Sequence, residues 1–296
     1  MPPFTLGLDV GATKIAAGLV TGHRVPKVVS VATPKNNRRE VIAAIAKVAE
    51  IFLHPKVTAV GVGIAGAVNS ARGLVYASPN FPRDFRQVHL AVALSRRLHR
   101  RVTVENDAKC FVLAEATYGA GRGRPTVVGF TLGSGIGFGA VVDGKLLRGR
   151  DGLAGEFGHT TVVEHGLRCS CGKSGHLESY ASGGGMVRFY RQLTGELIDT
   201  FELERRAHAG ETAARRTIDF ASDVLALWLS NAIATFNPDV VVLGGGLIRL
   251  PMLWRSAVPR ARRLVPYRQF GDTPIRRAKL GNNAGIIGAA LVANQV

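Results

Sequence analysis

Cysteine is scarce in this chain, with three residues among 296, and the odd number prevents complete pairing into disulfides. We therefore expect a protein of a reducing compartment and predict a cytoplasmic location. No apolar run reaches the roughly 18–20 residues that a helix needs to cross a bilayer. The first residues also lack a basic segment followed by an apolar core, so the sequence predicts neither export nor a membrane partner.

Acidic residues are also few: 21 Asp and Glu stand against 38 Lys and Arg, a net charge of +17. An excess of this size attracts polyanions such as nucleotides, polyphosphate or nucleic acid. The cations are scattered in pairs such as Arg96-Arg97, without a long basic tail or a basic stripe interleaved with aromatic residues. A general bias toward Arg explains the charge about as well as a bound partner does, and no nucleic-acid partner is predicted.

The hydrophobic pattern predicts two lobes of alternating strands and helices. Strands are expected at residues 4–10 and 15–20 around a glycine-bearing turn, and a second round begins with strands at 126–132 and 138–142. There is no strict sequence repeat, but both halves follow this scheme, and 296 residues suffice for two cores. Such alternation favours an α/β protein, in which ligands gather where loops leave the strand ends, here in a cleft between the lobes.

The first glycine turn carries groups that suit phosphate. Backbone N–H groups of the turn at Gly11, the Thr13 hydroxyl and the Lys14 ammonium can meet phosphate oxygens, while Asp9 can hold Mg²⁺ through water. The spacing of a Walker loop is absent. A plain hairpin turn is the alternative interpretation.

Two further glycine turns lie in the second half. Gly133-Ser134-Gly135-Ile136-Gly137 repeats the design of the first turn, and together the two suggest a phosphate chain held from both sides. Gly244, Gly245 and Gly246 follow a buried strand and permit the close approach of a flat group such as adenosine. A tight strand-to-helix turn accounts for these three glycines nearly as well.

Asp107 is a candidate general base, because it follows a short strand and lies beside Asn106 in an expected loop. A carboxylate there can accept the proton of an attacking hydroxyl during phosphoryl transfer. The alternative is that Asp107 is the N-cap of a helix at residues 108–118, a role that is compatible with that of a base.

A metal site is predicted between residues 155 and 178. His159, Cys169, Cys171 and His176 offer the imidazole and thiolate ligands that zinc prefers, and a closed set of four is typical of a structural site. His165 is a competing ligand. The flanking Glu156 and Glu178 would then be presented to a polar ligand together with His159. The alternative is a glycine-rich surface loop with two incidental thiols.

Taken together, these motifs resemble the ROK family (repressor, open reading frame, kinase), in the family's order and over almost the whole chain. The resemblance rests on Asp9-x-Gly11-x-Thr13-Lys14, Glu105-Asn106-Asp107-Ala108, Gly133-Ser134-Gly135-Ile136-Gly137, Glu156-x-Gly158-His159, Cys169-x-Cys171-Gly172-x-x-Gly175 and Gly244-Gly245-Gly246. It implies the actin-like ATPase fold of two ribonuclease-H-like lobes with a cleft between them. The expected lobes are residues 1–107, rejoined by a C-terminal helix at about 283–296, and residues 108–282, which carry the zinc loop.

The resemblance further implies a sugar kinase, similar to the bacterial glucokinase branch, that uses ATP, Mg²⁺ and a structural Zn²⁺. Asp107 would be the base on the sugar 6-hydroxyl, and a homodimer or higher homo-oligomer is expected. The expected sugar-binding residues are Gly66, Asn80, Asn106, Glu156, His159 and Glu178.

The chain departs from the family pattern at His176, where the family has a third cysteine, so a His₂Cys₂ site is expected. Lys109, beside the base, also stands where relatives often carry a small or amide residue.

Two alternatives remain within kinases: polyphosphate as donor, or fructose or N-acetylmannosamine as acceptor. A sugar-responsive regulator is disfavoured, because the phosphate turn begins at Asp9 and leaves no room for a DNA-binding segment before it.

Overall fold

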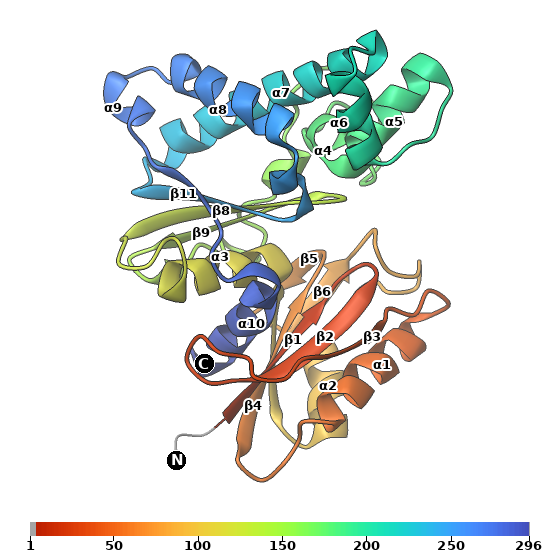
Figure 1. Ribbon diagram of the computed structural model, residues 1–296. Coiled ribbons are helices and arrows are strands. Elements are labelled where there is room, and N and C mark those ends of the chain that lie inside the picture. Colours follow the sequence, from red (N-terminus) through yellow and green to blue (C-terminus); the bar gives the residue numbers. More distant parts are fainter. Residues whose placement is uncertain (1–3, 296) are drawn as a thin grey trace. The chain divides into compact units, whose positions relative to one another are not determined.

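The computed structural model describes residues 4–295; Met1, Pro2 and Pro3, which the sequence places at the start of a strand-like run, lie outside them. The chain forms two compact units (Figure 1). The first comprises the residues up to Gly123, Gly139–Gly155 and the residues from Ala278 onward, and the second comprises Arg124–Phe138 and Glu156–Arg277. This grouping differs from the expected lobe boundaries at residues 107 and 282, which stay a prediction.

The first unit contains a five-stranded sheet of order β3-β2-β1-β4-β7. Strand β1 pairs antiparallel with β2 and parallel with β4, which in turn pairs parallel with β7. In this register Asp9 and Glu105 both lie opposite Gly63, so the carboxyl ends of three parallel strands meet at one edge. The strands are β1 (Phe4–Val10), β2 (Lys14–Val20), β3 (Val29–Ala32), β4 (Val57–Ile64) and β7 (Arg101–Asn106).

Helix α10 (Ala284–Asn294) lies directly on this sheet, beside α3 (Asp107–Tyr118) in Figure 1. A Cβ added at Gly7 would lie 2.0 Å from the carbonyl oxygen of Ile286, so glycine is needed for this close approach. The C-terminal helix is therefore part of the first core. The remaining elements are α1 (Arg38–Glu50), α2 (Leu90–Leu98), the hairpin β5 (Ala67–Asn69) and β6 (Leu74–Ala77), and η3 (Gly281–Asn283).

The second sheet repeats the strand order of the first, as β10-β9-β8-β11-β12, and the boundary between the units falls within β9. Strand β11 pairs parallel with β8 and with β12, and the short β10 pairs antiparallel with β9. The shared scheme expected from the sequence is thus present in both sheets. The strands are β8 (Thr126–Leu132), β9 (Ile136–Val142), β10 (Lys145–Leu146), β11 (Val240–Gly244) and β12 (Ile275–Arg277).

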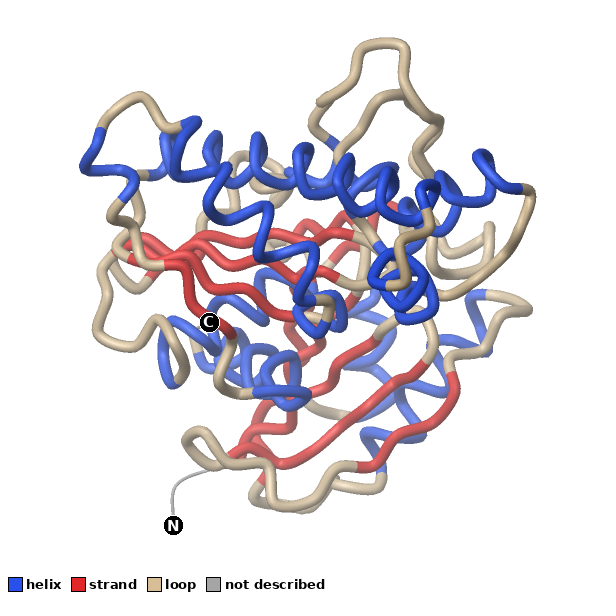
Figure 2. Tube along the Cα trace, turned by 45° about the horizontal axis from the view of Figure 1, so that its top comes forward, coloured by secondary structure: helices blue, strands red, loops and turns tan. Residues whose placement is uncertain are grey.

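Helices of the second unit lie in a layer along its strands (Figure 2). The long helix α7 inserts Trp228 against Phe130 of β8, with ring centroids 3.8 Å apart. None of the helices within residues 4–295 combines the length and apolarity needed to cross a bilayer. The elements are η1 (Phe157–His159), α4 (Glu178–Ala181), α5 (Gly183–Thr194), α6 (Thr200–His208), α7 (Thr212–Phe236), η2 (Gly246–Arg249), α8 (Pro251–Leu264) and α9 (Arg268–Gly271).

Candidate active site and metal centre

Asp107 is the first residue of α3, immediately after strand β7. Asn106 caps the helix, because its Oδ1 accepts the backbone N–H of Lys109 at 3.1 Å. The alternative interpretation of Asp107 as the N-cap is therefore wrong. So is the expected loop, since Glu105 and Asn106 belong to β7. Asp107 Oδ1 accepts the N–H of Ala108 at 2.9 Å, and the carboxylate is not used to cap the helix.

Gly66 and Asn106, both predicted to contact the sugar, come together in the first unit. The Asn106 side-chain amide donates to the Gly66 carbonyl at 3.0 Å. Gly66 has a φ of +125°, and a Cβ there would lie 2.6 Å from the carbonyl oxygen of Ala77. Only glycine fits this position, which in turn orients the Asn106 amide.

Asp9 and Asp107 influence each other electrostatically at the edge where β1 and β7 end. Burial, followed by the negative charge of Asp107, raises the pKa of Asp9 to about 6, against a lowering effect of Lys14. Burial also raises the pKa of Asp107, against the lowering effect of its backbone hydrogen bonds. Two carboxylates that repel each other are a suitable place for a divalent cation or for a proton acceptor.

The turn that follows Asp9 is held closed within the first unit. Its Gly11 N–H donates to the Lys14 carbonyl at 3.0 Å. The Lys35 ammonium donates to the carbonyls of Ala12 and, at 3.0 Å, of Asn80. Lys35 thus connects the predicted phosphate turn to the predicted sugar loop. Lys35 was not predicted as a site residue, because it lies in a polar stretch of sequence without a motif that indicates this role.

The two glycine turns of the second unit lie next to each other. The Gly133 N–H donates to the Gly135 carbonyl at 3.0 Å, and the Gly183 N–H at the start of α5 donates to the Gly133 carbonyl at 2.8 Å. Gly245 has a φ of +93°, and a Cβ there would lie 2.3 Å from the carbonyl oxygen of Leu132. The ends of β8 and β11 therefore present two backbone turns side by side. A Cβ added at Gly133, after β8, or at Gly246, after Gly245, would meet no atom within 4 Å.

His159, Cys169, Cys171 and His176 come together, with their ligand atoms all within 4.8 Å of one another. Cys169 Sγ lies 3.5 Å from His159 Nδ1, and Cys171 Sγ lies 3.2 Å from His176 Nδ1. Bonds of about 2.0–2.3 Å in a tetrahedron put neighbouring ligand atoms about 3.5 Å apart, so the set fits a zinc ion. His165 is outside the cluster, with 92% of its side chain exposed. Burial, followed by the charge of His159, lowers the pKa of His176 and favours its neutral, ligating form.

Glu178 connects the metal loop to a glycine turn. Its Oε2 accepts the N–H of Ile136 at 3.1 Å, and its Oε1 accepts the hydroxyl of Ser170 at 3.0 Å. A Cβ at Gly135 would lie 2.7 Å from the Glu178 carboxylate, which explains the small residue there. Glu156 directly precedes η1, which ends at His159.

The predicted site residues therefore form two groups, one in each unit. The single site expected to combine them stays a prediction. The first group is Asp9, Gly11, Thr13, Lys14, Gly66, Asn80, Asn106 and Asp107, and the second is Gly133, Ser134, Gly135, Gly137, Glu156, His159, Glu178, Gly244, Gly245 and Gly246.

Comparisons with known proteins show the family to which the chain belongs. The model of the ROK family matches residues 5–296. The chain is 36% identical to a glucokinase of Thermotoga maritima, over 99% of this chain and 98% of the relative. It is 35% identical to an N-acetyl-D-glucosamine kinase of Pectobacterium atrosepticum, over 97% of each.

A solved structure is similarly close. The ROK family glucokinase of Streptomyces griseus, in complex with glucose and AMPPNP, has a TM-score of 0.84 and 33% identity, over 99% of this chain and 100% of that one. The chain belongs to the ROK family. The expected actin-like ATPase fold, with α/β sheets of ribonuclease-H-like order, is thereby confirmed.

Proposed function

We propose that this protein is an ATP-dependent hexose kinase that phosphorylates the sugar 6-hydroxyl, with glucose as the preferred acceptor. The observation that carries the proposal is Asp107: its carboxylate stands at the end of a parallel strand, is not used for helix capping and has a raised pKa. Family membership and kinase relatives at about 35% identity support a sugar phosphotransferase. We expect the protein to be a homo-oligomer and to act in the cytoplasm.

In this proposal Asp107 accepts the proton of the sugar 6-hydroxyl while the hydroxyl oxygen attacks the γ-phosphorus. The bond between the γ-phosphorus and the bridging oxygen breaks at the same time, and ADP is the leaving group. A carboxylate with a raised pKa is a stronger base, which suits proton transfer near neutral pH. Asn106, already fixed by Gly66, accepts or donates hydrogen bonds to sugar hydroxyls and keeps the attacking oxygen in place. The other residues proposed to hold the sugar are Asn80, Glu156, His159 and Glu178.

The chain's groups also suit the proposed cofactors. Asp9, beside Asp107, is the residue that would hold Mg²⁺, which neutralises phosphate charge when bound. The turns at Gly11–Lys14 and Gly133–Gly137 offer N–H groups, the Thr13 hydroxyl and the Lys14 ammonium to the phosphates, and Gly244–Gly246 leaves room for the nucleoside. Zn²⁺ would be held by two histidines and two cysteines and would fix the loop that carries His159.

The test compares Asp107→Asn with a matched change, Asp143→Asn, at an exposed hairpin residue with positive φ. Removing a general base costs about 10²–10⁴ in rate, so Asp107→Asn should lose at least that factor in kcat while its glucose affinity, measured calorimetrically, stays near the wild-type value. Asp143→Asn should behave as wild type in both measurements. Near-normal turnover of Asp107→Asn would exclude Asp107 as the base.

The identity of the acceptor and donor needs its own panel. Since a glucokinase and an N-acetylglucosamine kinase are nearly equally similar to this chain, an N-acetylhexosamine is the second candidate acceptor. Purified protein should be assayed with glucose, mannose, fructose and N-acetylated hexosamines, each with ATP and with polyphosphate. Turnover with N-acetylglucosamine but not glucose would replace the proposed acceptor. Turnover with polyphosphate alone would replace the proposed donor.

A further inference from the structure

The first unit contains a cavity that the proposed reaction does not use. Its volume is about 810 Å³, within the range of small-molecule sites. It opens beside the amino-terminal half of the edge strand β7, away from the end that carries Asp107. The lining residues are Ser70, Ala71, Arg72, Gly73, Ala91, Arg101, Val102, Thr103, Lys145, Leu146, Arg148 and Gln295.

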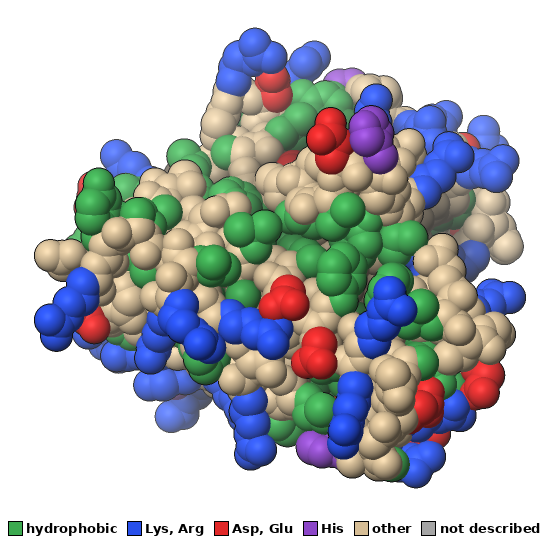
Figure 3. Space-filling model, turned by 90° about the horizontal axis from the view of Figure 1, so that it is seen from above, with side chains coloured by type: hydrophobic (Ala, Val, Ile, Leu, Met, Phe, Trp, Pro, Cys, Tyr) green, Lys and Arg blue, Asp and Glu red, His purple; other side chains and the backbone are tan. Residues whose placement is uncertain are grey.

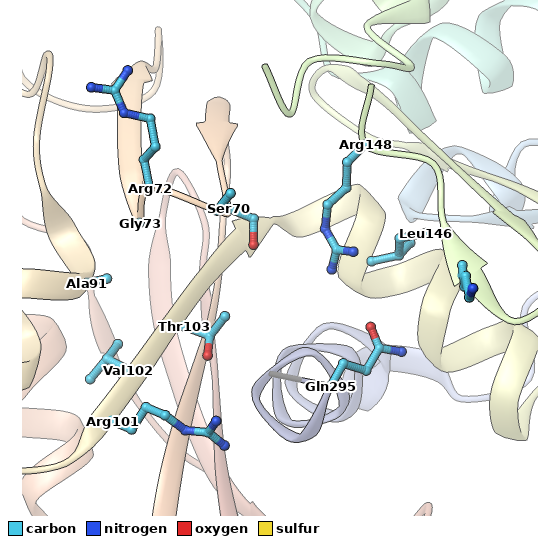
Figure 4. Close-up of a pocket in the computed structure, with 12 residues that line it drawn as sticks. Ser70, Arg72, Gly73, Ala91, Arg101, Val102, Thr103, Leu146, Arg148 and Gln295 are labelled. Atoms are coloured by element: carbon cyan, nitrogen blue, oxygen red, sulfur yellow. The ribbon is translucent and has the colours of Figure 1, made fainter. Parts of the chain in front are cut away.

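Four of these lining residues are cations and none is acidic. On the face drawn in Figure 3, by comparison, Lys and Arg side chains are scattered among acidic and apolar ones. In Figure 4 the Arg101 and Arg148 side chains extend toward the space that lies between them, whereas Arg72 points away from it. Concentrated positive charge beside neutral donors is the arrangement that binds a phosphate group.

Two of the cations are held in place by buried partners. Arg148 Nε donates to Glu105 at 2.8 Å, and the Glu105 side chain is completely buried. Arg101 Nη2 donates to the carbonyl of Ala293 at 2.9 Å, at the end of α10. Because only Nε of Arg148 has a hydrogen-bond partner among residues 4–295, its two terminal nitrogens can still donate to a ligand.

The neutral lining groups add hydrogen-bond donors and limit the size of the ligand. The hydroxyls of Ser70 and Thr103 face the space between the arginines in Figure 4. Val102 and Leu146 supply apolar walls. The cavity is larger than inorganic phosphate requires, so it has room for an organic part of a ligand as well.

We infer that this cavity binds a small phosphorylated molecule, through Arg101, Lys145 and Arg148. The inference concerns a site in the first unit alone and does not depend on which sugar the protein phosphorylates. The ligand is a compound with a phosphate or diphosphate group and a body of the size of a monosaccharide or nucleoside.

The test is titration calorimetry with pyrophosphate as the probe. Lys145→Gln and Arg101→Gln remove pocket cations, while Arg39→Gln removes an exposed cation of α1 and serves as the matched control. Removing one charge-assisted hydrogen bond to the probe should weaken binding about tenfold, and the double variant should bind about a hundredfold more weakly, whereas the control stays within about twofold of wild type. Binding to any other site is unchanged by the pocket substitutions, so the difference between variants reports the cavity alone.

Equal affinity of the pocket and control variants would overturn the inference, as would the absence of saturable binding by wild type at millimolar pyrophosphate. If Arg101→Gln fails to fold because the hydrogen bond to Ala293 is missing, Lys145→Gln still decides, since Lys145 is an exposed residue of the short strand β10. Hexose phosphorylation is measured in parallel. Pyrophosphate binding by a protein without kinase activity would support this inference and contradict the proposed function. Kinase activity without pyrophosphate binding would overturn this inference and leave the proposed function standing.

Discussion

Replacing His176 with Ala tests whether an imidazole has taken the place of a thiolate in a zinc site. His176 is 8% exposed, and its Nδ1 lies 3.2 Å from Cys171 Sγ. Structural zinc binding contributes about 10–16 kcal/mol in small domains, so one ligand of four accounts for about 3 kcal/mol. We therefore expect His176→Ala to bind zinc about 100-fold more weakly than wild type in a chelator competition assay, and to lose zinc during purification.

His165→Ala is the matched control, because His165 lies in the same loop but outside the cluster. By elemental analysis His165→Ala should contain one zinc per chain, which is also the content that we expect of the wild type. His176→Cys should also keep zinc, since a thiolate restores the family pattern. Zinc binding by His176→Ala that is as tight as in wild type would refute the proposed ligand set, and so would loss of the metal from His165→Ala instead.

Three further predictions concern the first unit. Gly7→Ala places a methyl group 2.0 Å from the Ile286 carbonyl oxygen, so α10 must shift and the melting temperature should fall by the equivalent of about 1–3 kcal/mol; an unchanged melting temperature would contradict this packing. Arg148→Ala leaves the buried Glu105 carboxylate unpaired and should cost about 3 kcal/mol in urea unfolding, most of which a second change of Glu105 to Gln should recover. The raised pKa of Asp9 means that the native state binds the proton of this carboxyl group more tightly than the unfolded state does. The free energy of unfolding should therefore decline as the pH rises from 3.8, the ordinary pKa of Asp9, to about 6. In denaturant titrations over this pH range, Asp9→Asn should show a smaller decline.

Strands whose sequence is a buried apolar run could be predicted from the sequence, because burial on both faces leaves little ambiguity. Residues 4–10 and 126–132 form β1 and β8 with the expected bounds, and each ends at a glycine-bearing turn. The candidate phosphate-binding residues lie in these turns, so the hydrophobic pattern that predicts the strands also predicts where these residues lie along the chain.

Elements that depend on tertiary contacts could not be predicted in this way. Helix α8 carries Pro259 in its interior and many arginines, and it is stabilised by packing on α7 rather than by its own propensity. Strand β12 has three residues, two of them arginine, and exists because the edge of β11 supplies a partner for Arg276. Lys35, which joins two predicted ligand-binding loops, has no signal in the sequence at all.

The pairing register of strand β7 decides which of the two neighbours Asn106 and Asp107 caps helix α3. Both side chains are favoured at helix N-caps, and sequence alone does not tell which one performs that role. Because β7 continues through Asn106, opposite Ile64 of β4, the helix can begin only at Asp107. Asn106 then accepts the backbone N–H of Lys109 and is oriented by Gly66, while Asp107 lies at the sheet edge where β1 ends with Asp9 nearby. The pairing register of the edge strand β7, rather than any property of the two residues themselves, thus leaves the Asp107 carboxylate free of the capping role and available for the proposed role of base.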